Sequence, residues 1–325
     1  MTDTSAKAGG PSVNFPPVLN GLDFLESTVD LLSVKEDVPP RNLKYAVVHL
    51  ASAAETLFKA RLAMKTPALV WAAPGDYDPA RHVRGDFKSC GWEDARKRVI
   101  KECSLETELL EPRHFRALAQ MRNRIAHVGV TESALTVEVL TTPVLDNLLT
   151  FVREDLLPLV EGGELALAEE AVERIRPGLG RIQRLVDRRM EPARELLGKW
   201  PTILGCPVCA ALAVPVEGGG DLTCVVCDSR LGSPREAAWI YADTSEHEVV
   251  TGGGSYPVHR CDECGTEAVT DVPTDGNGDA SRLLCLFCGL ECEGVCGYCG
   301  LAVSNFAIPD ADMCGDCFEY RMQRY

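Results

Sequence analysis

The chain has 325 residues, which is long enough for two or three domains. Its content of 46% hydrophobic and 25% charged residues is typical of a folded globular protein and excludes wholesale disorder. A formal net charge of −15 excludes coating of nucleic acid through bulk electrostatics, so any such contact has to be local. Residues 1–18 have no basic segment followed by an apolar run, and no apolar stretch approaches about 18 residues. We therefore expect neither a signal peptide nor contact with a membrane.

Composition changes near Trp200. Thirteen of the 15 cysteines follow residue 200. Residues 1–200 carry a net charge of −2, whereas residues 201–325 carry −13, from 6 basic and 19 acidic side chains without a single Lys. Most cysteines form Cys-x-x-Cys pairs, a pattern that indicates metal binding in a reducing cytosol. The sequence therefore predicts a cytoplasmic protein with two different parts.

The N-terminal part has the pattern of an all-α helical bundle. Residues 1–19 are polar and rich in Pro and Gly, and we expect a flexible tail there. Helical periodicity over residues 20–160 predicts helices at residues 22–32, 43–64, 92–103, 112–128 and 144–160, the second of them central and buried. Residues 66–90 contain several Pro and Gly residues and are predicted to form a long loop. Residues 161–200 are predicted to form a helical connector, either a pair of solvated helices or an arm for dimerisation or docking.

Arg122, Asn123 and His127 lie at the end of the predicted 112–128 helix. Their side chains suit RNA cleavage, because an imidazole moves protons near neutral pH and a guanidinium holds phosphoryl oxygens. Positions five apart lie about 140° apart around a helix, so Arg122 and His127 do not share a face, whereas Asn123 and His127 do. One copy of the motif is therefore an awkward active site.

This segment resembles the HEPN family (higher eukaryotes and prokaryotes nucleotide-binding), many of whose members are metal-independent endoribonucleases. The family signature is Arg, a polar residue, a short spacer and His, and Arg122-Asn123 with His127 fits its shortest form. Residues 45–59 look like the central helix of the family, with Glu55 as its acidic residue. The resemblance covers about residues 20–160. It implies a homodimer, an RNA substrate attacked by its own 2′-hydroxyl group, and catalytic roles for Arg122, Asn123, His127 and Glu55. Gly129 stands where a variant of the signature has Tyr.

Simpler interpretations of these side chains remain open. Arg122 and Arg124 fit a solvated basic face, and Glu55 fits an i,i+4 ion pair with Lys59. His49 fits a hydrogen-bonded histidine of the core.

The C-terminal part contains three sets of four cysteines. The sets are Cys206, Cys209, Cys224 and Cys227; Cys261, Cys264, Cys285 and Cys288; and Cys296, Cys299, Cys314 and Cys317. Two turns, each carrying two thiolates, complete one tetrahedral zinc site without an open position, which is typical of structural zinc. We therefore expect three zinc ions in three small β-rich zinc ribbons at residues 201–232, 233–290 and 291–325.

Three other potential ligands lie near these sets. Cys292 is left over and is an alternative ligand for either of the last two sets. His247 and His259 are not expected to be ligands, because the sets are already full.

Together these features predict a HEPN-type metal-independent endoribonuclease with acidic zinc ribbons for recognition or regulation. The alternative is a non-catalytic dimeric adaptor whose zinc ribbons bind protein partners.

Overall fold

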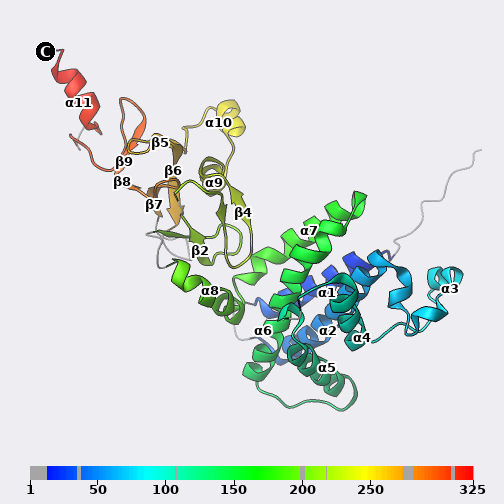
Figure 1. Ribbon diagram of the computed structural model, residues 1–325. Helices are drawn as coiled ribbons and strands as arrows, with labels where there is room; N and C mark the ends of the chain where they lie inside the picture. The colour runs from blue at the N-terminus through cyan, green and yellow to red at the C-terminus, as the bar shows by residue number, and fades with distance from the viewer. Residues whose placement is uncertain are drawn as a thin grey trace, which may run out of the picture. The chain divides into compact units, whose positions relative to one another are not determined.

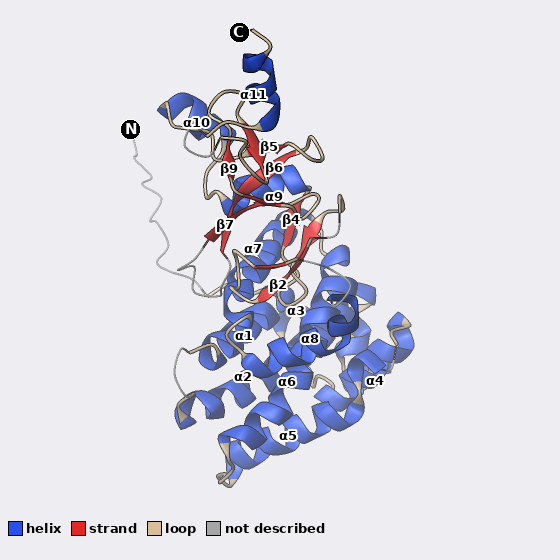
Figure 2. Cartoon of the chain, turned by 90° about the vertical axis from the view of Figure 1, so that its left-hand side faces the viewer, coloured by secondary structure: helices blue, strands red, loops and turns tan. Residues whose placement is uncertain are grey.

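The computed structural model describes residues 13–34, 38–106, 108–197, 202–216, 218–273, 281–308 and 312–324. The chain divides into two compact units, residues 1–175 and residues 176–325. The first is helical and the second is rich in strands, which confirms the predicted fold class (Figures 1 and 2). Most of the predicted tail (residues 1–12) and the composition change at Trp200 lie outside the described residues.

In its described residues, the helical unit contains seven α-helices and five short helical turns. The α-helices are α1 (Pro17–Leu32), α2 (Pro40–Lys65), α3 (Pro79–Arg84), α4 (Trp92–Cys103), α5 (Pro112–His127), α6 (Ala134–Phe151) and α7 (Gly162–Leu179), the last of which continues into the second unit. The turns are η1 (Pro67–Val70), η2 (Pro74–Asp76), η3 (Glu108–Leu110), the π-helical η4 (Val152–Leu156) and η5 (Leu157–Leu159).

Helix α2 is the centre of the helical unit, as its nearly continuous apolar sequence predicts. Its Leu50, Leu57 and Phe58 side chains are fully buried. The ring of Phe58 lies 5.4 Å from that of Phe115 on α5 and 5.6 Å from that of Phe151 on α6. Aromatic packing of this kind fixes α5 against α2, and α5 carries the candidate catalytic residues.

Helix α6 differs from its prediction, because it begins at Ala134 rather than near Val144. The Ser133 hydroxyl caps it by accepting a hydrogen bond from the Thr136 amide at 3.1 Å. Pro143 lies inside the helix. A proline usually ends a helix, and the β-branched residues around Pro143 weaken the helical signal further. The predicted helix therefore began after Pro143 instead of before it.

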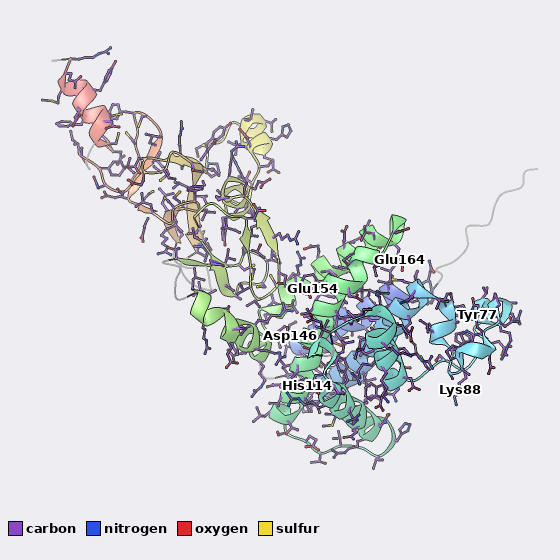
Figure 3. The ribbon with its side chains drawn as sticks, viewed as in Figure 1. Tyr77, Lys88, His114, Asp146, Glu154 and Glu164 are labelled. Atoms are coloured by element: carbon purple, nitrogen blue, oxygen red, sulfur yellow. The ribbon has the colours of Figure 1, made fainter. Side chains whose placement is uncertain are left out.

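The segment of residues 66–90 is more ordered than the predicted loop. Its turns η1 and η2 and helix α3 each begin with a proline, whose fixed φ suits a first helical position. The Arg98 guanidinium holds the segment by donating to the carbonyl oxygens of Leu69, Trp71 and Ala72 at 2.6–3.0 Å. Tyr77 and Lys88 project from this segment (Figure 3).

One stretch of the described chain, Ala134–Leu159, is long and apolar enough to cross a membrane by length and composition alone. This corrects the expectation that no such stretch exists. Half of its most apolar window is buried inside the protein. Leu145, Leu148 and Phe151 are fully buried there, and the core helix of a globular bundle meets the same criteria.

The close contact between α1 and α2 yields a stability prediction. A Cβ atom at Gly21 would lie 2.5 Å from Cδ2 of the fully buried Leu57. Gly21→Ala should therefore overpack this contact and destabilise the helical unit by about 1–3 kcal/mol. Gly163→Ala is the matched control, because that helical glycine has open space around it and gains helix propensity. A thermal melt followed at 222 nm should show a lower midpoint for Gly21→Ala only.

After the end of α7, the second unit contains α8 (Gln183–Leu197) and a series of short strands and helices. The strands are β1 (Ile203–Gly205), β2 (Leu212–Pro215), β3 (Leu222–Thr223), β4 (Arg230–Gly232), β5 (His259–Cys261), β6 (Glu267–Pro273), β7 (Ser281–Cys285), β8 (Glu291–Cys292), β9 (Gly294–Val295) and β10 (Leu301–Val303). The helices are α9 (Pro234–Tyr241), α10 (Glu246–Gly252) and α11 (Gly315–Met322).

The strands form two hairpins and one larger sheet. Strand β1 pairs with β2 and β3 pairs with β4, both antiparallel. The larger sheet has the order β8-β7-β6-β5-β10-β9, and only its β5–β10 pair is parallel. Its strands contain Cys261 and Cys285 of the second set, and Cys296 and Cys299 of the third set lie in the turn between its strands β9 and β10. The predicted boundary at residues 290 and 291 therefore falls within one continuous sheet.

Helices α7 and α8 occupy the predicted connector. Helix α7 continues through Pro177 to Leu179, although a proline usually ends a helix. It is not simply solvated, because Ala168, Ala171 and Ile175 are buried at helical spacing. Arg174 also pairs with Glu26 of α1 at 2.9 Å, so this part of α7 belongs to the bundle.

Candidate metal centres and candidate catalytic cavity

The twelve predicted cysteines come together in three sets of four. Within each set all four sulfur atoms lie within 4.8 Å of one another. Sγ–Sγ distances between the two pairs of a set are 3.6–3.8 Å. Four sulfurs placed at tetrahedral corners about 2.3 Å from a zinc ion would lie about 3.8 Å apart. The donor sets therefore fit tetrahedral metal ions.

Tight turns point the paired thiols to one side. In five of the six pairs the residue after the second Cys has a positive φ and donates its amide hydrogen to the carbonyl oxygen of the first Cys at 2.8–3.0 Å. These residues are Ala210, Asp228, Gly265, Gly289 and Gly300. The three glycines are the signal that the sequence offers, because glycine adopts this conformation without strain. Ala210 and Asp228 adopt it without that signal.

The sixth pair is built differently. Cys314 is the N-cap residue of α11, and Cys317 lies in the first turn of that helix. The Cys314 amide donates to Sγ of Cys296 at 3.4 Å. The third set therefore holds a helix against a hairpin turn.

Neighbouring groups favour the thiolate form at some positions of each set. In the first set, hydrogen bonding among the thiols lowers the pKa of Cys227 and raises that of Cys224. In the second set, burial opposes the charge at Cys264, but hydrogen bonds led by the Thr266 hydroxyl bring its pKa down to about 7. In the third set, burial again opposes the charge, and backbone amides led by that of Cys314 lower the pKa of Cys296 to about 6. A bound cation would ionise the remaining thiols.

Cys292 does not join a set. Its side chain is 6% exposed and packs in the sheet core with Val269 and Ala302. Burial raises its pKa to about 12, which keeps the thiol neutral. His247 and His259 also lie outside the three sets, as expected.

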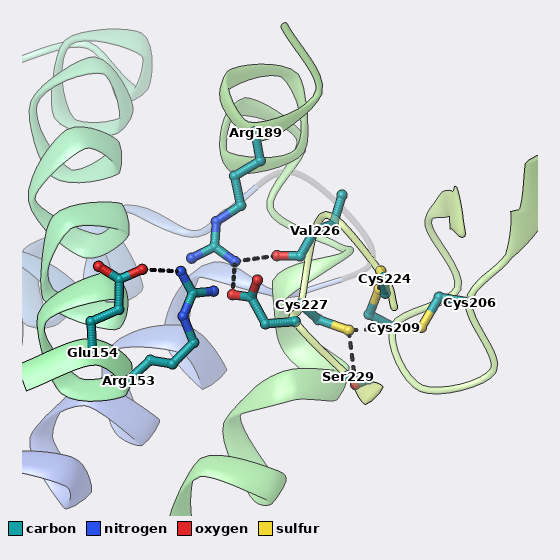
Figure 4. Close-up of polar contacts among 10 residues, drawn as sticks. Arg153, Glu154, Arg189, Cys206, Cys209, Cys224, Val226, Cys227 and Ser229 are labelled. Carbon is teal, nitrogen blue, oxygen red and sulfur yellow. Dashed lines mark hydrogen bonds and ion pairs between the residues drawn. The ribbon is translucent and has the colours of Figure 1, made fainter. Parts of the chain in front are cut away.

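The first set is attached to helix α8. The Arg189 guanidinium, 9% exposed, pairs with the carboxylate of Asp228 at 3.0 Å and donates to the carbonyl oxygen of Val226 (Figure 4). Ser229 adds a contact of 3.0 Å between its hydroxyl and Sγ of Cys227. Val226 lies between Cys224 and Cys227, the second Cys pair of this set, and Asp228 directly follows it. Helix α8 therefore stabilises the turn that presents these two thiols.

The helical unit has a cavity of about 50 Å³ between α2, α4 and α5. Glu55 on α2 and Arg122 and Asn123 on α5 all line it, together with Trp92 of α4. The half-buried Arg122 donates to the Asn123 side-chain oxygen at 3.1 Å. Three of the four predicted catalytic residues therefore lie together, although Glu55 is far from the others in sequence.

Glu55 is also paired, as its simpler interpretation suggested. Its Oε1 accepts a hydrogen bond from Nζ of Lys59 at 2.6 Å, and Lys59 reaches the Ser89 hydroxyl at 2.9 Å. Because this lysine balances its charge, Glu55 is suited to accept a hydrogen bond rather than to abstract a proton.

His127 is exposed and does not line the cavity. It is the last residue of α5, one turn beyond Asn123, so it shares a helix face with a residue of the cavity wall. Arg124 lies between them in sequence and pairs with Glu132 at 2.8 Å. Nδ1 of His49 shares a 2.8 Å hydrogen bond with the Ser27 hydroxyl, in which either atom can be the donor. Its ring packs between those of Phe24 and Tyr45, as expected for a core histidine.

Exposed apolar side chains follow His127. Val128 is 86% exposed, and Leu135 and Val139 on α6 are each 54% exposed. Leu135 and Val139 are one turn apart and so share a helix face. We call Val128, Leu135 and Val139 the apolar patch.

No protein family, curated protein or solved structure matches the chain. The functional assignment therefore depends on the site itself.

Proposed function

We propose that the helical unit is a metal-independent endoribonuclease of the HEPN type. The observation that carries this proposal is the convergence of Glu55, Arg122 and Asn123 on one cavity, with His127 one turn further along the same helix face. Glu55 supplies a hydrogen-bond acceptor, Arg122 a fixed cation and Asn123 a neutral polar group. His127 supplies the group that carries the proton.

Each side chain has a role in attack by a ribose 2′-hydroxyl group. Arg122 stabilises the negative charge that develops on the phosphoryl oxygens. His127 moves the proton, because imidazole is the side chain best suited to general acid–base catalysis near neutral pH. Asn123, held by Arg122, orients the phosphate, and Glu55 accepts a hydrogen bond from the ribose. DNA lacks the 2′-hydroxyl and cannot react in this way.

The proposed enzyme is a homodimer formed through the apolar patch. His127 lies outside the cavity of its own chain, and the patch begins at the residue that follows it. Covering the patch with a second copy would remove exposed apolar surface from water and bring two His127 side chains to the interface.

Replacing Leu135 and Val139 by Asp should separate the dimer. Four carboxylates at one interface repel each other and require desolvation, so dissociation should become easier by about 100-fold or more. Light scattering should find a dimer for the native chain and a monomer for the double variant, with loss of RNA cleavage. Val83→Asp is the control, because Val83 is likewise an exposed apolar side chain (86%) but lies on α3, outside the apolar patch. A native chain that cleaves RNA as a monomer would contradict the composite site.

We further propose that the three Cys sets hold structural zinc, in a chain that works in a reducing compartment such as the cytoplasm. The tetrahedral fit of the sulfurs and the all-thiolate donor set support zinc. Four thiolates leave no position for a water molecule, so these ions would take no part in hydrolysis. With zinc bound, each set adds a formal charge of about −2.

The second candidate function is the dimeric adaptor, whose acidic zinc unit would bind protein partners. The exposure of His127 outside the cavity favours it, because an adaptor does not require a complete site.

Incubation with single-stranded RNA in EDTA tests the proposal against the adaptor. The full chain should cleave RNA and spare DNA of the same sequence, and brief exposure to EDTA should not stop it. Intact RNA after prolonged incubation with dimeric, zinc-loaded protein would favour the adaptor.

A further inference from the structure

The C-terminal end of the second unit carries an open groove that the proposed function does not use. Tyr298, Tyr320, Arg321 and Arg324 line it beside the metal-ligand candidate Cys317, and its volume is about 790 Å³. Tyr298 comes from the turn between Cys296 and Cys299, and the other residues come from α11 and its end (Figure 1). We call these four residues the Tyr/Arg groove.

The two tyrosines of the groove expose large aromatic surfaces. Tyr298 is 57% exposed and Tyr320 is 58% exposed. Each ring has an arginine beside it, with the guanidinium carbon of Arg321 lying 5.7 Å from the centroid of Tyr298 and that of Arg324 lying 4.6 Å from the centroid of Tyr320. Arg321 also donates to the Tyr298 hydroxyl at 3.1 Å. These contacts hold the aromatic rings and the cations together.

The two arginines of the groove are not neutralised by a carboxylate. Arg235 and Arg282 pair with carboxylates in this acidic unit, whereas Arg321 and Arg324 pair with none among the residues that the structure describes and are the two that lie beside exposed aromatic rings. Asp316 and Glu319 lie on α11 but do not line the groove. The groove is thus a local cationic site in a region of net charge −13.

We propose that the Tyr/Arg groove binds single-stranded nucleic acid. Bases stack on Tyr298 and Tyr320, and backbone phosphates contact Arg321 and Arg324, the combination by which proteins bind single strands without sequence preference. The acidic surface elsewhere on the unit repels phosphate and confines the contact to this groove. Aromatic faces and guanidinium groups without a carboxylate partner lie side by side here, and this pairing matches the alternating bases and phosphates of one strand. The proposal is independent of RNA cleavage by the helical unit.

Fluorescence anisotropy with a labelled 2′-O-methyl oligonucleotide tests this directly, because that probe has no free 2′-hydroxyl and cannot be cleaved by the proposed reaction. The full, zinc-loaded chain should bind it at low salt. Tyr298→Ala and Tyr320→Ala should each weaken binding by about 5- to 100-fold, the usual loss for one stacked base. Tyr256→Ala is the matched control, since Tyr256 is 42% exposed in the same unit but packs on Trp239.

The salt dependence separates a phosphate contact from a general change in folding. Arg324→Gln should reduce the slope of log affinity against log salt by about 0.7, the loss of one contact to a single strand. Arg230→Gln should leave the slope unchanged. Tyr298→Phe keeps the ring and should bind like the native chain, and zinc content should stay constant in every variant.

Two results would overturn the proposal. One is failure of the native chain to bind the oligonucleotide, which would leave a protein segment as the ligand of the groove. The other is an equal loss in Tyr256→Ala and Tyr298→Ala, which would place the binding site elsewhere. Neither result bears on RNA cleavage, which is measured separately with ordinary RNA.

Discussion

Removal of zinc is expected to unfold the second unit and leave the helical unit folded. Structural zinc sites contribute on the order of 10 kcal/mol each to folding, which is as large as the whole stability of an ordinary domain. The strands of this unit have at most seven residues, and several have two or three. Cysteines form much of its sheet core, so little apolar packing remains without the metal.

A strong zinc chelator at 25 °C tests this expectation. Hydrogen exchange should become fast across the strands while the amides of α2 and α5 stay protected, and elemental analysis of untreated protein should give three zinc ions per chain. Cys285→Ser should lower the zinc content to two. Cys292→Ala should keep it at three, because Cys292 belongs to the sheet core rather than to a set. Finding one zinc ion or fewer in folded protein would refute the assignment.

His127→Ala is expected to lower the rate of RNA cleavage by about 100- to 10,000-fold, the usual loss when a general acid or base is removed. Because His127 is exposed at the end of α5, the substitution should leave the melting temperature nearly unchanged. Single-turnover cleavage rates on one RNA would measure the effect. His247→Ala, which also removes an exposed histidine, should cleave at the native rate.

The two arginines of the motif provide a second comparison. Arg122 lines the cavity, whereas Arg124, two residues further along α5, pairs with Glu132. Arg122→Ala should reduce the rate by about 100- to 1,000-fold, the loss typical of one charge-stabilising donor. Arg124→Ala should change it little. Equal rates for both variants would show that the cavity is not where RNA reacts.

The sequence predicted the fold best where a pattern has one physical cause. The Cys-x-x-Cys spacing identified all three thiol sets, because two thiols can face one ion only across a tight turn. The helical pattern placed α4 and α5 to within one residue and α2 to within three residues of their observed ends. Short-range patterns failed at Pro143, which α6 tolerates, and at residues 66–90, where Arg98 organises the chain through contacts 26–29 residues away. Such distant contacts leave no local signal.

The candidate catalytic site was only partly predictable. The motif on α5 identified Arg122, Asn123 and His127, but their relation to Glu55 depends on how α2 packs against α5. The i,i+4 pair of Glu55 with Lys59 was one of the predicted alternatives, whereas the contact of Lys59 with Ser89, 30 residues away, has no local pattern. Sheet pairing between β5 and β10, which joins the second and third thiol sets, is likewise a long-range feature without a local pattern.

Analysis of the RNA product ends tests the proposed chemistry most directly. Attack by the 2′-hydroxyl group leaves a 2′,3′-cyclic phosphate on one fragment and a 5′-hydroxyl group on the other. We expect mass spectrometry to find these ends after cleavage by the full chain in EDTA, and to find no cleavage above background with His127→Ala. Fragments that carry a 5′-phosphate, or native-rate cleavage by His127→Ala, would contradict the assignment.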